Sequence, residues 1–159
     1  ISQGKTTFAF IGDNGDHAPE FKARFTGYYR TLLAHGLDKN SSQFDAISTE
    51  DAGSEAIRGL IEAGELPQAI VCASDLIAMG ALRALRQAKI KVPDDVAVVG
   101  YDNIAVSAYT TPALTTVQQN TKLAGELLVS ALLKAINNEE VDDYLMPAEV
   151  IVRQSCGSQ

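Results

Sequence analysis

Strand-like and helix-like segments alternate along the 159-residue chain, and this alternation constrains its fold more than any other feature. Short apolar runs rich in Val, Ile and Phe are typical of buried strands, whereas apolar residues three and four positions apart are typical of helices with one buried face. Strands that alternate with helices indicate βαβ units. We therefore predict an α/β fold with an open, mainly parallel sheet and helices on both faces.

The predicted strands are short, and the first four are followed by polar residues. They cover residues 7–11, 44–47, 68–73 and 96–100, with an extended segment at 114–117 and a closing strand at 148–155. Pro112 favours an extended backbone ahead of residues 114–117, because proline disfavours helical geometry in the residue before it.

Each predicted helix has an apolar stripe. The first carries Phe21, Phe25, Tyr28, Tyr29, Leu32 and Leu33 and ends at Gly36. The second follows Ser48 or Thr49 as its N-cap, with acidic residues in its first turn. The third, at 76–88, follows a cap supplied by Ser74 and Asp75 and is expected to bury Leu76, Ile77, Gly80, Ala81 and Leu85. A last helix spans about 121–137, with a stripe from Leu123 to Ile136.

Composition excludes several classes of protein. The formal net charge is −7 and no run of Lys or Arg occurs, so these residues offer no basic surface for a nucleic-acid backbone. No stretch approaches the roughly 18 consecutive apolar residues of a membrane helix, and no secretory signal precedes the first strand. Cys72 and Cys156 lack metal-ligand spacing, so we expect reduced thiols in a cytoplasmic protein.

Signatures of enzymes are missing from the sequence. It has no GxSxG elbow, no GxxxxGK[ST] phosphate loop and no HExxH pair, and the loop GDNGD lacks the third glycine of a dinucleotide fingerprint. We therefore predict no catalytic residue, no cofactor and no metal site. A hydrolase or kinase on a similar sheet is disfavoured for the same reason.

Short polar side chains follow four of the predicted strands. Asp13, Ser48, Ser74 and Asp102 with Asn103 occupy these positions. In an open parallel sheet the carboxyl ends of the strands border the ligand crevice, so these side chains should meet at one edge. Carboxylates and hydroxyls bind hydroxyl-rich ligands well. Alternatively, the serines and Asp75 cap helices, which is the role we favour for Asp75, or Asp102 hydrogen-bonds its own turn.

Two long segments resemble the lactose-repressor (LacI/GalR) family of bacterial transcription regulators. They are AIVCASDLIAMGALRALRQAKIKVPDDVAVVGYDN and YTTPALTTVQQNTKLAGELLVSALL, followed by MPAEVIVRQS at the end. The first strand TTFAFIGD and the helix segment ARFTGYYRTL fit the same family, so the resemblance covers essentially the whole chain.

The resemblance implies a sugar- or nucleoside-like effector held between two periplasmic-binding-protein-like subdomains, and operator DNA bound through a helix-turn-helix headpiece. Residues 1–117 correspond to the C-terminal subdomain. Residues 118–145 form a crossover helix that packs on the other subdomain, and residues 146–159 form the return strand and tail. The chain is thus expected to be a fragment without headpiece or first subdomain, whose helix 121–137 drives self-association.

The resemblance also assigns roles to single residues. Asp102 of GYDN is the anchoring carboxylate and Arg24 of ARFTGY the anchoring arginine. Ser74 falls where members often contact the effector, and Ser48 falls near a position where many members place a stacking aromatic ring. With Asn103 and Asp13, these residues form the predicted effector site.

A homodimer interface is implied as well. It involves the helix LIAMGALRAL and the segment IAVSAYTTP, with Leu76, Met79, Leu82, Arg83, Ile104 and Tyr109 as the predicted contacts. The alternative is that these apolar residues pack within the domain. For the protein as a whole, the alternative is a periplasmic sugar-binding protein of a transport system.

Overall fold

A parallel sheet forms the centre of the computed structural model, which describes residues 1–13, 15 and 18–157. Its strands are β1 (Phe8–Ile11), β2 (Ser41–Phe44), β3 (Ala69–Cys72) and β4 (Ala97–Val99), in the spatial order β2-β1-β3-β4. Every pairing among these strands is parallel. The predicted α/β fold with a mainly parallel sheet is confirmed.

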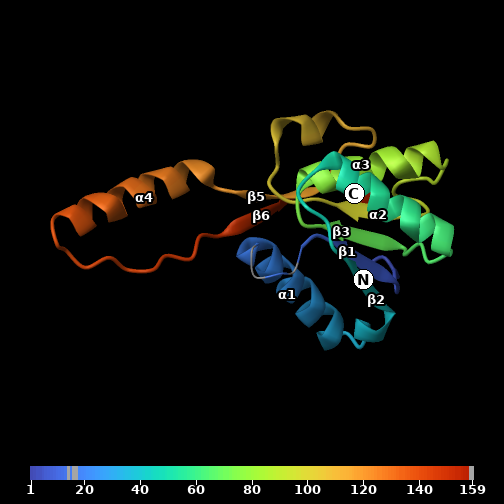
Figure 1. Ribbon diagram of the computed structural model, residues 1–159, viewed down its shortest axis with the longest axis horizontal. Helices are drawn as coiled ribbons and strands as arrows, with labels where there is room; N and C mark the ends of the chain where they lie inside the picture. The colour runs from blue at the N-terminus through green and yellow to red at the C-terminus, as the bar shows by residue number, and fades with distance from the viewer. Residues whose placement is uncertain (14, 16–17, 158–159) are drawn as a thin grey trace.

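Helices lie on both faces of this sheet (Figure 1). Helix α1 (Pro19–Ala34) covers one face, and α2 (Glu50–Ala63) and α3 (Asp75–Gln87) lie together on the other. The N-caps of α2 and α3 lie at predicted residues. Thr49 Oγ1 accepts a hydrogen bond from Ala52 N at 3.2 Å, and Ser74 Oγ accepts one from Ile77 N at 3.4 Å.

Helices α2 and α3 approach each other at two glycines. A Cβ at Gly80 would lie 1.8 Å from the carbonyl oxygen of Glu50, and a Cβ at Gly53 would lie 2.1 Å from that of Ile77. Both contacts are with backbone atoms, which cannot rotate away. The absence of side chains at these positions therefore allows the two helices to pack backbone to backbone.

The hydrophobic core joins the sheet to these helices. Its fully buried side chains include Phe10, Ile57, Ile70, Ile77 and Leu85. On the α1 side, the rings of Phe10 and Phe25 meet edge to face at 5.4 Å between centroids.

A two-stranded ribbon extends away from the sheet and the helices that pack on it. Strands β5 (Thr116–Gln119) and β6 (Ala148–Ile151) pair antiparallel, and helix α4 (Thr121–Ile136) continues outward from them (Figure 1). No residue of α4 is buried, although the helix is strongly apolar. Its exposed side chains include Leu128, Val129, Leu132, Leu133 and Ile136.

Three local predictions are wrong. The second strand lies at Ser41–Phe44 and not at 44–47, because an edge strand that pairs only with β1 does not need an apolar run. Leu76 is 37% exposed and does not join the buried side of α3. On α1, Tyr29 and Leu33 face solvent, because the sheet covers fewer residues of this helix than the predicted apolar face includes.

No helix in residues 1–13, 15 and 18–157 combines the length and apolarity required to cross a membrane.

Substitution of Gly80 by Ala should destabilise the chain by about 1–3 kcal/mol or more, because the new methyl group overlaps the Glu50 carbonyl. Gly59→Ala is the matched control: the position lies in α2 with nothing within 4 Å of the added Cβ. It should stabilise the helix by about 0.5–1 kcal/mol. Urea unfolding of both variants measures these changes, and equal stabilities would contradict the described packing of α2 on α3.

The exposed face of α4 should make the chain self-associate at high concentration. Burial of several hundred Å² of apolar surface contributes several kcal/mol at about 25 cal/mol per Å². Sedimentation velocity should show dimers or larger species, and Leu128→Glu with Leu132→Glu should shift them toward monomer. Leu33→Glu, an exposed position on α1, is the control. A strictly monomeric unsubstituted chain would contradict this prediction.

Candidate functional site

Two predicted anchors meet at the carboxyl edge of the sheet. Arg24 lies on α1 and Asp102 in the loop after β4, and Arg24 Nη2 is 3.3 Å from Asp102 Oδ1. Arg24 Nη1 also donates a hydrogen bond to the carbonyl oxygen of Ala73, and its guanidinium lies 3.8 Å from the centroid of the Tyr101 ring. The arginine is thus fixed on several sides.

The two side chains of this pair differ in exposure. The Arg24 side chain is 15% exposed, whereas that of Asp102 is 36% exposed. A carboxylate has about four acceptor positions, and a single bond to Arg24 leaves most of them free for further donors. The pair can therefore present acceptors and donors to a hydroxyl-rich molecule at the surface.

The two predicted serines also meet, next to the third strand. Ser48 Oγ donates to Ser74 Oγ at 2.7 Å, and Ser74 is 2% exposed. Ser74 also caps α3, so its oxygen is largely occupied within the protein. Ser48 is exposed and is the more accessible hydroxyl of the two.

The remaining two predicted site residues serve the protein's own loops. Asp13 Oδ1 accepts a hydrogen bond from Gly15 N at 2.7 Å, as in an Asx turn. The Asn103 side chain donates to Gln118 Oε1 at 2.7 Å and accepts from Arg153 Nη2 at 2.6 Å. Both ends of the Asn103 amide are therefore engaged internally.

The loop that carries Asp102 has an unusual backbone. Asp102 has φ 110° and Asn103 has φ 49°, which lie in the region that favours glycine. Such conformations cost on the order of 1–3 kcal/mol each and persist only where surrounding contacts impose them. Here Asp102 N donates to Val117 O at 2.9 Å, and Asn103 N donates to Thr116 Oγ1 at 3.2 Å.

Asp75 does not cap α3, contrary to the prediction. Its side chain is 0% exposed, with Oδ2 accepting from Ile104 N at 2.9 Å and Oδ1 accepting from Thr116 Oγ1 at 2.6 Å. A Cβ at Gly100 would lie 2.2 Å from Asp75 Oδ1, so the glycine of the GYDN segment makes room for this carboxylate. Ser74 alone supplies the cap, which leaves Asp75 available for the loop.

Arg153 is a site residue that the sequence did not reveal. From the segment just after β6 it donates to Asn103 Oδ1, to Ser107 Oγ at 3.0 Å and to Leu114 O at 2.7 Å. The sequence shows only a basic residue ahead of a serine near the end of the chain. Its partners lie 39 to 50 positions earlier, too far apart for a local pattern to show.

Burial raises the pKa of both aspartates above the ordinary range. For Asp102 the positive charge of Arg24 partly offsets this effect. For Asp75 the hydrogen bonds from Thr116 and Ile104 oppose it. A carboxylate whose pKa is shifted by burial and held beside an arginine at a sheet edge is typical of a binding site.

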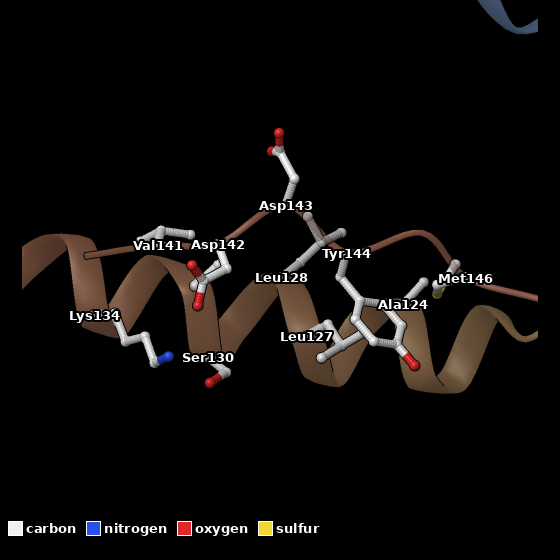
Figure 2. A pocket seen from close by; sticks show the side chains of 11 residues that line it. Ala124, Leu127, Leu128, Ser130, Lys134, Val141, Asp142, Asp143, Tyr144 and Met146 are labelled. Carbon is white, nitrogen blue, oxygen red and sulfur yellow. The ribbon is translucent and has the colours of Figure 1, made fainter. Parts of the chain in front are cut away.

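Besides a hollow of about 930 Å³ lined by Lys5, Pro93 and Arg153, two hollows concern the predicted residues or the exposed helix α4. One, of about 320 Å³, is mostly apolar and is bordered by Phe10, Val71 and Tyr101; Arg24 is the predicted site residue that lines it. The other, of about 480 Å³, lies between α4 and the segment 141–146 (Figure 2). Its apolar walls include Leu127, Leu128 and Tyr144, and it contains no predicted site residue.

The predicted dimer contacts are unevenly placed. Tyr109 is 85% and Leu76 37% exposed, whereas Leu82 is 6% exposed and packs in the core, where it is unavailable to a partner chain. Met79, Arg83 and Ile104 are half-buried. Arg83 Nη2 donates to Asp51 Oδ1 at 2.8 Å and to Ser54 Oγ at 3.0 Å, which ties α3 to α2.

Within the described residues, no group of three or more His, Cys, Asp or Glu side chains could hold a metal ion.

Comparison with known proteins gives the family of the chain. Residues 1–156 match the model of the periplasmic binding protein-like domain. The chain belongs to this family.

Its relatives are transcription regulators. The chain is 36% identical over 160 residues to the HTH-type transcriptional regulator RegA of Clostridium saccharobutylicum. This alignment covers 98% of the chain and 48% of RegA. It is 30% identical over 158 residues to the HTH-type transcriptional repressor PurR of Aliivibrio salmonicida, covering 98% of the chain and 47% of PurR. The chain thus spans about half the length of these relatives.

A solved structure shows the same architecture. The lac repressor dimer bound to operator and the anti-inducer ONPF superposes with a TM-score of 0.89 at 25% identity, over 98% of this chain and 54% of that one. The resemblance to the lactose-repressor family and the periplasmic-binding-protein-like fold are therefore confirmed.

The raised pKa of Asp102 makes a prediction for stability. The folded state binds this proton more tightly than the unfolded state, so the group adds stability as the pH falls from neutral through the raised pKa and loses it as the pH rises. The free energy of unfolding of the unsubstituted chain should therefore increase relative to that of Asp102→Asn as the pH falls toward 4. Asp51→Asn, at a side chain 85% exposed, is the control for removal of an aspartate at the surface. The opposite slope would mean that Arg24 outweighs burial.

Proposed function

We propose that this chain is the effector-sensing and dimerising part of a bacterial transcriptional regulator. The observation that carries the proposal is the Arg24–Asp102 pair at the carboxyl edge of the sheet. In open α/β sheets this edge is where ligands bind.

A sugar or a nucleoside-like molecule is the effector that suits this site. A carboxylate accepts hydrogen bonds from two neighbouring hydroxyl groups, and a guanidinium donates in a fixed fork. Asp102 has free acceptor positions at the surface, and Ser48 adds an exposed hydroxyl at the same edge. The pair would therefore suit a ligand with adjacent hydroxyl groups better than an apolar one.

The rest of the regulator lies outside these residues in our proposal. Residues 118–145 would cross to a second subdomain, which would supply the other wall of the cleft and cover α4. Operator DNA would be bound through a helix-turn-helix headpiece; RegA is named as an HTH-type transcriptional regulator and PurR as an HTH-type transcriptional repressor. The net charge of −7 supports this division, because an acidic chain repels the phosphate backbone of DNA.

Effector binding would act through a two-state equilibrium. A ligand that binds the closed cleft more tightly than the open one shifts the protein toward the closed state, and the headpieces gain or lose affinity for DNA accordingly. The dimer would form through the exposed parts of α3 and the segment 104–109, with Leu76 and Tyr109 as its most accessible contacts.

The relatives favour a regulator over a transport protein. RegA and PurR are named as transcription regulators, so a periplasmic sugar-binding protein has no support from them. We accordingly propose a cytoplasmic location and no enzymatic activity.

Arg24→Lys in the complete regulator should weaken the effector by about tenfold or more, because a hydrogen bond to a charged group contributes about 1.5–3 kcal/mol and lysine lacks the planar fork. Fluorescence anisotropy of operator DNA, with monosaccharides and purine nucleosides added in turn, measures the concentration at which affinity changes. Arg30→Lys, exposed on the same helix, is the matched control. An unchanged response in Arg24→Lys would contradict the proposed site.

A further inference from the structure

The orientation of Asp102 depends on its loop more than on its own side-chain contacts. Residues 101–104 turn sharply out of β4 through two positive φ angles. Without outside contacts such a turn relaxes to a less costly conformation, and Asp102 is then no longer held beside Arg24. The contacts that impose the turn therefore decide whether the pair forms.

A single residue holds both ends of this loop. Asp75 N donates to Tyr101 O at 2.7 Å, and Asp75 Oδ2 accepts from Ile104 N at 2.9 Å. Its other oxygen accepts from Thr116 Oγ1, and Thr116 Oγ1 in turn accepts from Asn103 N at 3.2 Å. Three of the four loop residues thus connect to Asp75 directly or through one hydroxyl.

The chemistry of this position favours a carboxylate. Both oxygens of Asp75 accept from donors that are themselves fixed, and the side chain is 0% exposed. An asparagine offers one acceptor and one donor, so its NH₂ group would face either Ile104 N–H or the Thr116 hydroxyl. Burial of a carboxylate is costly, and these bonds offset the cost only while the loop keeps its shape.

Arg153 holds the same loop from the opposite direction. Its guanidinium donates to Asn103 Oδ1 and Ser107 Oγ, and its backbone N donates to Thr115 Oγ1 at 2.8 Å. The positive charge also favours the ionised form of Asp75. The loop is therefore enclosed between α3 on one side and the ribbon segment on the other.

We propose that Asp75 is a positioning residue of the effector site, which brackets residues 101–104 so that Asp102 Oδ1 reaches Arg24 Nη2. Asp75 does not contact the effector in this proposal. Its carboxylate accepts hydrogen bonds from Ile104 N and Thr116 Oγ1 and lies against Gly100. The importance of the Arg24–Asp102 pair rests on the proposed function. The contacts between Asp75 and residues 101–104 do not depend on that function.

The test is a double-mutant cycle read by NMR, without any effector. The Arg24 Nε–Hε resonance of the ¹⁵N-labelled chain is recorded for the unsubstituted chain, Asp102→Asn, Asp75→Asn and the double variant. The quantity of interest is the shift that Asp102→Asn causes in each background, because local distortion from Asp75→Asn alone cancels in this difference.

The expected result is that Asp102→Asn shifts the Arg24 resonance in the unsubstituted chain and that this shift is lost in the Asp75→Asn background, where the pair is already broken. Asp51→Asn, at an exposed aspartate paired with Arg83, is the control background and should retain the full shift. An equal shift in the Asp75→Asn and unsubstituted backgrounds would overturn the proposal.

A second variant covers the case in which Asp75→Asn does not fold. Thr116→Val keeps the shape of the side chain and removes the hydroxyl that links Asp75 to Asn103. The proposal expects a reduced shift in this background. A full shift in folded Thr116→Val would overturn it. Because no effector is involved, failure here is distinguishable from failure of the effector assay in the complete regulator.

Discussion

The parallel register of β1, β3 and β4 brings the carboxyl ends of the three strands to one edge of the sheet. Ile11 lies opposite Cys72 and Val71 lies opposite Val99, so the three strands end within one residue of one another. The chain then leaves each strand through polar residues that share one edge. Arg24 reaches this edge from α1 and meets Asp102 there, although 78 positions separate them in the sequence. The Arg24–Asp102 pair, which we propose as the effector site, is a consequence of strand register.

Much of the fold could be predicted from the sequence because its elements are locally consistent. The apolar runs, the caps at Thr49 and Ser74 and the spacing along α3 all favour the observed elements. The second strand was misplaced because an edge strand has no apolar signature, and the burial of α1 was overestimated because the pattern does not show how far the sheet extends. The pairing of Arg24 with Asp102 followed from the family resemblance, not from local pattern.

The roles of Asp75 and Arg153 could not be predicted in the same way. An acid after a serine at a helix start fits a cap as well as a buried acceptor, and only the approach of the loop after β4 decides between them. Arg153 contacts residues that are distant in the sequence. The two side chains explain how a loop with positive φ at Asp102 and Asn103 is maintained. They also connect that loop to the ribbon that leads to α4, so the site and the crossover segment are parts of one hydrogen-bonded unit.

The most direct measurement is a crystal structure of the complete regulator with the monosaccharide or nucleoside that changes its operator affinity. We expect ligand hydroxyls to lie within hydrogen-bonding distance, about 2.7–3.2 Å, of both the Asp102 carboxylate and the Arg24 guanidinium. We also expect a second subdomain to close the other side of the cleft and pack against α4. A ligand bound elsewhere, with the Arg24–Asp102 pair in contact with solvent alone, would contradict the proposed effector site.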